Sequence, residues 1–221
     1  MTSYNHTKRF KKQSLITRII NDIRVSKLRR NHFFECGDNL RILGATPYLK
    51  APSSAAGMVR IGNNVVLNSD SKNSNTNVTT RVKFVLGYEG NIEIGDNCDL
   101  NGVCIVSYKS VKIGSYCQFA SSTMISDTDF HPVDSKERHR QMSGEPFCFD
   151  SVKKKEIIIG DNSWIGWGCI ILKGAHIGNN CIVAAGSVVL GKDYPDNSII
   201  AGNPAKVVKI NERFYDTFFK S

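Results

Sequence analysis

The sequence lacks several features that would place it in common protein classes. None of its 221 residues lie in a run approaching the ~20 apolar residues of a membrane-spanning helix. The opening segment, MTSYNHTKRFKKQ, has no secretory hydrophobic stretch. The seven cysteines form no CxxC pair and match no zinc-site spacing, so no metal is expected. These absences predict a cytoplasmic protein without a membrane span.

Acidic residues are scarce near the start of the chain. Residues 1–50 contain eleven Lys or Arg and only three acidic residues, which accounts for +8 of the net charge of +9. This basic arm is either a solvated surface or a binding site for an acidic partner, such as an anionic polysaccharide or a membrane surface. Its sparse aromatic residues argue against nucleic acid. Its apolar residues recur at helical spacing: Leu15, Ile16, Ile19, Ile20 and Ile23. This spacing predicts an amphipathic helix that carries Arg and Lys on its outer face.

Branched aliphatic residues recur every six positions in the second half of the chain. They are Ile159, Ile165, Ile171, Ile177, Val183 and Val189. An earlier block repeats the pattern, with a one-residue slip after the third member: Ile94, Leu100, Val106, Ile113, Phe119 and Ile125. The fourth residue after most of these anchors is small. Five cysteines occupy that position, where a reduced thiol serves as a compact core residue: Cys98, Cys104, Cys117, Cys169 and Cys181.

A six-residue unit suits a solenoid with a triangular cross-section. Each unit supplies one short strand and one corner, and three units close one coil. Stacked coils lie ~4.8 Å apart and cover each other's backbone edges, so only the two ends need caps. The expected organisation is a basic, partly helical extension over residues 1–55, the solenoid over 56–207 and a C-terminal helix over 208–221.

The repeat is interrupted at residues 125–134, ISDTDFHPVD. Ile125 is the last regular anchor, and His131 occupies the next anchor position. Residues 132–156 are charged and aperiodic before the repeat resumes at Ile157. The pattern predicts a long loop that leaves the solenoid, and such loops often carry function.

The repeats, the WIG motif at residues 164–166 and the sequence IIAGNPAKVVK at 199–209 resemble the hexapeptide-repeat acyltransferases. The resemblance covers roughly residues 60–209 and is strongest to the galactoside, maltose and capsule O-acetyltransferase branch. It implies an all-β solenoid, a left-handed parallel β-helix. It also implies a homotrimer with sites between neighbouring subunits, and acetyl-CoA as co-substrate. From physics alone, a right-handed crossover would be expected.

The resemblance assigns the catalytic base to His131, because the family's histidine begins an extruded loop and is often followed by proline. An imidazole, with a reference pKa of ~6.5, can accept the proton of a sugar hydroxyl as it attacks a thioester. Either Asp127 or Asp129 would orient the ring, and each is otherwise a turn residue. A backbone N–H near Trp167 and Gly168 would stabilise the oxyanion.

The resemblance also assigns the cofactor contacts. Pantetheine would approach Trp167, Ala185 and Gly186, and the phosphates of CoA would pair with the two lysines of the closing motif, Lys206 and Lys209. Trp164 lines the acceptor cleft or packs at the trimer interface. Asn101 lies beside the position of the family's acceptor-binding asparagine.

The expected function is acetyl-CoA-dependent O-acetylation of a carbohydrate, in a capsule, exopolysaccharide or O-antigen, and the basic arm suits an anionic polymer. N-acetylation of an amino sugar shares nearly every motif. A non-catalytic solenoid would not need a histidine at an anchor position. A carbonic anhydrase of the same fold would need three converging histidines, and the spacing of His131, His139 and His176 does not provide that family's close pair.

Overall fold

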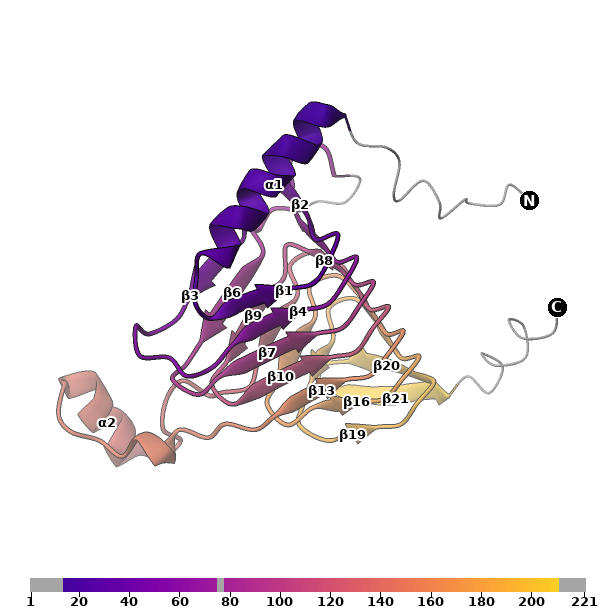
Figure 1. The fold of residues 1–221 in the computed structure, drawn as a ribbon. Helices are drawn as coiled ribbons and strands as arrows, with labels where there is room; N and C mark the ends of the chain where they lie inside the picture. The colour runs from indigo at the N-terminus through magenta and orange to yellow at the C-terminus, as the bar shows by residue number, and fades with distance from the viewer. Residues whose placement is uncertain (1–13, 75–77, 211–221) are drawn as a thin grey trace.

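The protein forms a left-handed parallel β-helix of three sheets, here called sheets A, B and C (Figure 1). The computed structural model describes residues 14–74 and 78–210. Three successive strands make one coil, and each strand pairs in parallel with the strand three places later in the chain. The pair β20–β21 is antiparallel. The all-β solenoid predicted from the six-residue repeat is confirmed.

The strands are short, and each sheet contains one strand from each coil. Sheet A contains β1 (Phe34–Cys36), β4 (Val59–Ile61), β7 (Asn91–Ile94), β10 (Ser110–Ile113), β13 (Ile157–Ile159), β16 (His176–Ile177) and β19 (Asp193–Tyr194). Sheet B contains β2 (Arg41–Gly44), β5 (Val66–Ser69), β8 (Asp99–Asn101), β11 (Gln118–Phe119), β14 (Trp164–Ile165), β17 (Ile182–Val183), β20 (Ser198–Gly202) and β21 (Ala205–Ile210). Sheet C contains β3 (Tyr48–Lys50), β6 (Lys83–Leu86), β9 (Cys104–Ser107), β12 (Met124–Ser126), β15 (Ile170–Leu172) and β18 (Val188–Val189).

The narrow interior is filled by the aliphatic anchors. All six anchors from Ile159 to Val189 are at most 2% exposed. One predicted anchor of the earlier block is wrong, because the inward residue of β9 is Ile105 and not Val106. Ile105 is in register with the inward residues Phe84 and Ile125 of the neighbouring strands. The step from Leu100 to Ile105 is therefore five residues and the step from Ile105 to Ile113 is eight, so the repeat is irregular on both sides of β9.

This shift also moves one of the five cysteines. Cys104 precedes the inward Ile105 and so faces outward, since neighbouring strand residues point to opposite sides. The other four are buried, as predicted: Cys98, Cys117, Cys169 and Cys181. Burial raises the pKa of the Cys169 and Cys181 thiols, which therefore stay protonated in the core.

The corner between sheets A and B is built from a stack of asparagines. Each has a positive φ, which asparagine tolerates better than most residues: Asn39, Asn64, Asn97, Asn162, Asn180 and Asn197. Some of their side chains bond to each other along the stack, with Asn162 Nδ2 donating to Asn180 Oδ1 at 3.0 Å. The regular backbone turn at this corner keeps successive strands in register.

The solenoid begins at Phe34, whereas the sequence placed its start at residue 56. Strands β1, β2 and β3 pair with the next coil in all three sheets. Long corner segments over residues 51–58 and 70–82 interrupt the six-residue spacing, which is why the first coil has no visible repeat.

Helix α1 (Leu15–Arg29) lies against the first coil, where it contacts β1 and β2 (Figure 1). The predicted helix is present, but its orientation is not the expected one. Its inner side carries Asn21 and Arg24 as well as the buried Leu28, and the apolar residues named above face outward. No helix within the described residues is long and apolar enough to cross a membrane.

The last strand and the loop complete the molecule. A C-terminal helix was predicted over residues 208–221. Residues 208–210 belong instead to the strand β21, and residues 211–221 lie outside the described residues. Between β12 and β13 the chain leaves the solenoid and forms α2 (Ser135–Ser143) and a 3-10 turn (Phe149–Ser151). Figure 1 shows α2 standing away from the sheets.

Candidate active site

His131 lies on the outer surface, just after the chain leaves the solenoid at the corner between sheets C and A. Its Nδ1 is 2.8 Å from Oε1 of Gln141, which lies on α2. The Gln141 amide is oriented by a second bond, in which its Nε2 donates to the Phe130 carbonyl. Because Oε1 can only accept, Nδ1 carries the proton in the neutral ring. Nε2 is then the basic nitrogen of an exposed imidazole.

Helix α2 is fixed firmly enough to hold this contact. The Asp134 carboxylate caps its start and accepts bonds from the N–H groups of Glu137 and Lys136, which hold the pKa of Asp134 below its usual range. Arg138 donates to the carbonyls of Pro132 and Val133, so the helix is bonded back to the segment beside His131. Its last turn ends at a glycine with a φ of 73°.

Asp127 is fully buried and fastens the start of the loop to the preceding coil. Its carboxylate accepts bonds of 2.7 to 2.8 Å from the backbone N–H groups of Tyr108, Lys109 and Ser110. Its own carbonyl accepts from Lys155, near the end of the loop. Asp127 therefore joins both ends of the loop to one corner, which sets where His131 emerges.

Asp129 pairs with a lysine rather than with the histidine. Its Oδ1 lies 2.5 Å from Nζ of Lys173, and its backbone N–H donates to the Lys153 carbonyl. Within the described residues, neither Asp127 nor Asp129 forms a hydrogen bond or ion pair with His131. Gln141 takes the position that the sequence had given to one of the aspartates.

Sequence reasoning missed both Gln141 and Lys173. A local signal existed for α2, because Asp134 followed three residues later by Glu137 is a helix-start pattern. That pattern would have placed Gln141 on a helix. The sequence contains no signal for the fold of this helix back onto His131.

The predicted cofactor residues lie at the corner between sheets B and C. Trp167 is about half exposed, and Ala185 and Gly186 lie beside it in the next coil, where the Gly186 N–H donates to the Trp167 carbonyl at 2.7 Å. A Cβ added to Gly168 or Gly186 would meet nothing within 4 Å, so this corner presents open backbone. A ligand chain can approach it closely.

The backbone donors of this corner are not all available. The N–H of Gly168 donates to the Ser121 carbonyl, so it is already used. The N–H of Trp167 makes no hydrogen bond within the described part of the chain. Of the two residues named for the oxyanion, Trp167 is the one with a free donor.

The remaining predicted residues fall into two groups. Lys206 and Lys209 are exposed on β21, and Trp164 is half exposed on the outer side of β14. Asn101 is engaged within the coil: its Oδ1 accepts from Asn68 at 2.8 Å and its Nδ2 donates to the Phe119 carbonyl at 2.9 Å. Its amide is thus part of the solenoid wall.

One chain does not bring the base and the cofactor residues together. His131 emerges at the corner between sheets C and A, and Trp167 lies at the corner between sheets B and C. A strand of three residues, about 10 Å long, separates these corners. His131 instead lines an open hollow of 440 Å³ with Arg138, His139 and other α2 side chains. In the described residues no group of three His, Cys, Asp or Glu is placed to hold a metal ion.

Comparison with known proteins connects this geometry to a family. The sequence pattern of the bacterial transferase hexapeptide family (six repeats) matches residues 156–191. The galactoside O-acetyltransferase of Escherichia coli K12 is 38% identical over 135 residues, 60% of this chain and 61% of that protein. Another E. coli K12 protein, named as an O-acetyl transferase of lipopolysaccharide biosynthesis, is 35% identical over 149 residues, 65% of this chain and 74% of the relative.

A solved structure shares the fold. It is a variant of AntD, an N-acyltransferase from Bacillus cereus in complex with dTDP and coenzyme A, with a TM-score of 0.62 at 19% identity; the match covers 86% of this chain and 90% of that chain. The chain spans about three fifths of the length of the first curated relatives that it matches. With the repeat, the three-sheet solenoid and these relatives together, the chain belongs to the hexapeptide-repeat acyltransferase family.

Proposed function

We propose that this protein is an acetyl-CoA-dependent O-acetyltransferase that acts on a carbohydrate hydroxyl of a capsular polysaccharide, exopolysaccharide or O-antigen. The observation that carries the proposal is the state of His131. Its Nδ1 is held by Gln141, and its Nε2 is exposed and basic at the start of the extruded loop. That is the arrangement a general base needs.

The reaction is a direct transfer. The acceptor hydroxyl oxygen attacks the thioester carbonyl carbon while Nε2 of His131 takes the hydroxyl proton. The N–H of Trp167, which bonds to no other described residue, stabilises the oxyanion that forms. The C–S bond then breaks, and the imidazolium returns its proton to the leaving thiolate, giving the acetyl ester and CoA.

The cofactor binds along the corner between sheets B and C. Pantetheine lies against the open backbone at Trp167, Ala185 and Gly186, and the exposed Lys206 and Lys209 pair with the phosphates. Trp164, half exposed on the adjacent strand, lines the acceptor side of the cleft. No metal takes part in this scheme.

The site is shared between subunits of a homotrimer. His131 and the cofactor corner are separated within one chain, so a neighbouring copy must supply one of them. Asp127 and Asp129 act as positioning residues, because their carboxylates fix the loop from which His131 projects.

The test is acetyl transfer by the purified full chain. Acceptors of several classes are incubated with acetyl-CoA, and CoA release is followed by chromatography. A product that mild base cleaves is an ester, which supports O-acetylation. A base-stable product is an amide and would point to an amino-sugar acceptor instead.

His131→Ala provides the second test. The variant should lose ~10²-fold or more in kcat, because the general base is removed. Its unfolding transition should match that of the wild type, because the side chain is exposed. His139→Ala, on α2 beside the same hollow, is the matched control and should keep most of the activity. Wild-type turnover by His131→Ala would rule out the assignment of the base.

A further inference from the structure

Helix α1 rests on the solenoid through its polar side. Asn21 Nδ2 donates to the Leu40 carbonyl at 3.0 Å, and Asn21 Oδ1 accepts from the Ile42 N–H at 2.8 Å. One turn later, the Arg24 guanidinium donates to the Ile42 carbonyl at 3.1 Å. Leu28 alone among the α1 residues is buried in the core. These contacts fix which side of the helix faces the first coil.

The opposite side of α1 is an apolar surface that nothing in the described chain covers. At 3.6 residues per turn, the side chains at positions 16, 19, 20 and 23 gather on the side away from Asn21 and Leu28. They are strongly exposed, and with the first helical residue they make up what we call the outer face: Leu15 72%, Ile16 70%, Ile19 50%, Ile20 41% and Ile23 64%. Contiguous exposed apolar patches of this kind are typical of interaction sites.

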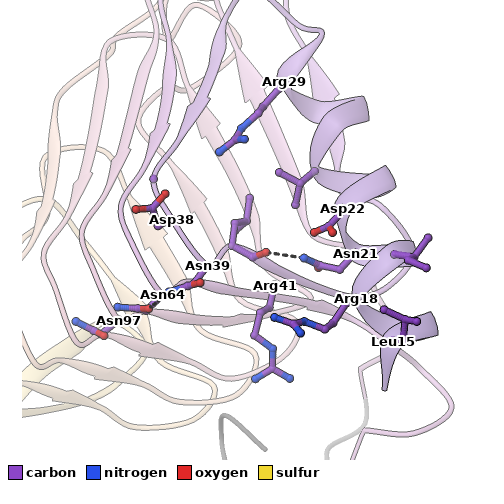
Figure 2. A pocket seen from close by; sticks show the side chains of 14 residues that line it. Leu15, Arg18, Asn21, Asp22, Arg29, Asp38, Asn39, Arg41, Asn64 and Asn97 are labelled. Atoms are coloured by element: carbon purple, nitrogen blue, oxygen red, sulfur yellow. Dashed lines mark hydrogen bonds between the residues drawn. The ribbon is translucent and has the colours of Figure 1, made fainter. Parts of the chain in front are cut away.

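Positive charge surrounds the outer face. Lys27 lies on the same side of α1 as the outer face, one turn beyond Ile23, and Arg30 follows at the end of the helix. Asp22 is the single acidic residue of α1. A groove of 980 Å³ lies between α1 and the first coil, and Leu15 and Ile19 at the edge of the outer face also line it. Figure 2 shows the guanidinium groups of Arg18, Arg29 and Arg41 along this groove with Asp22 and Asp38. The surface is therefore apolar at its centre and mainly cationic at its edges.

We propose that α1 is a peripheral membrane anchor that lies in the surface of an anionic lipid bilayer. An amphipathic helix with aliphatic residues on one side and Lys or Arg at the border inserts its apolar side at the boundary between headgroups and acyl chains. The stem of Lys27 extends along the apolar surface to place its ammonium among the phosphates. Arg30 contacts neighbouring headgroups, and Arg18 and Arg29 add positive charge from the groove side.

The charge pattern selects lipid as the occupant. Residues 14–30 carry five Lys or Arg and one acidic residue, and the sequence before them adds four more Lys or Arg and no acid. Each such residue near an anionic leaflet adds to the attraction, which is why basic residues beside an apolar helix are typical of membrane surfaces. The outer face has no aromatic or acidic side chain to pair with a basic protein partner.

The experiment measures binding of the full chain to vesicles. Vesicles of phosphatidylcholine alone and of phosphatidylcholine mixed with phosphatidylglycerol are sedimented with the protein. We expect binding to the mixed vesicles, weaker binding as salt is raised, and little binding to phosphatidylcholine alone. Replacing Ile19→Gln and Ile23→Gln together should lower the partition coefficient about tenfold or more, because two buried aliphatic side chains become polar.

A matched control comes from the other end of the solenoid. Val208 and Ile210 on β21 are 62% and 51% exposed, close to the values for the two isoleucines. The variant with Val208→Gln and Ile210→Gln should bind vesicles as the wild type does. Equal binding by the α1 variant and the wild type would overturn the proposal. Failure of the wild type to bind the anionic vesicles would overturn it as well.

Two further readouts distinguish lipid binding from self-association and from catalysis. If the α1 variant changes the oligomer size in solution and the wild type does not bind vesicles, the outer face joins copies of this chain, and the membrane proposal fails. Acetyl transfer to a soluble acceptor should be the same in the α1 variant and the wild type, because α1 holds none of the proposed site residues. Failure of the proposed enzyme function would leave the vesicle result unchanged.

Discussion

The position of one proton decides whether His131 can act as a base. The bond to Gln141 Oε1 places the proton on Nδ1 and leaves Nε2 with its lone pair. A carboxylate in the same place would favour the imidazolium more strongly. A neutral amide gives orientation without added charge, which suits a base that must be unprotonated before it reacts.

Two variants of Gln141 test this role. Gln141→Ala should lower kcat about tenfold with little change in KM, because the ring loses its orientation but the binding surfaces remain. Gln141→Glu keeps an acceptor at Nδ1 and adds a negative charge, so the ring stays protonated to higher pH. We expect the acidic limb of its pH–rate profile to move upward.

The measurement is the pH dependence of kcat/KM for the wild type and both variants. A purely structural role for Gln141 would lower activity equally at all pH values. An unshifted acidic limb in Gln141→Glu would therefore contradict the positioning role, even if the overall rate fell.

At the scale of the elements, the corner between sheets A and B has one exception to its asparagine stack. Tyr116 stands between Asn97 and Asn162 and has a φ of 61°, a backbone conformation that is costly for tyrosine. Its side chain is 61% exposed, so little packing is gained in return. In six other coils the residue at this position is an asparagine.

Tyr116→Asn should therefore stabilise the protein. The expected gain is about 1 kcal/mol in the free energy of unfolding, since asparagine adopts this backbone conformation more readily. Denaturant unfolding at one fixed protein concentration measures it. Tyr88→Asn is the control, because Tyr88 is equally exposed at 62% but has no positive φ. A loss of stability in Tyr116→Asn alone would show that the tyrosine side chain has a contact worth more than the strain.

The elements also show what the sequence can and cannot reveal. The solenoid was predictable because each coil returns to the same inward position, so Ile159 and its successors repeat visibly. The first coil was not predictable, because the long corner before β4 and the long corner after β5 interrupt the six-residue spacing. The outward orientation of α1 was hidden as well, since an apolar stripe does not identify its partner. Gln141 depends on how α2 folds back, and no repeat encodes that contact.

At the scale of the whole molecule, the separation of His131 from the cofactor corner predicts complementation between subunits. Two variants are co-expressed: His131→Ala, which lacks the base, and Ala185→Trp, which blocks pantetheine. Ala185 is exposed, so the larger side chain should not disturb the fold. Each parent trimer should be nearly inactive.

Mixed trimers should recover activity. In every mixed ring, one interface joins an intact His131 to an intact Ala185 surface, so random assembly restores about a quarter of the wild-type rate. Co-expression of His131→Ala with the double variant carrying both changes has no such interface and should stay inactive. A mixed preparation no more active than its parents would mean that each protomer contains a complete site, and the shared-site arrangement would then have to be abandoned.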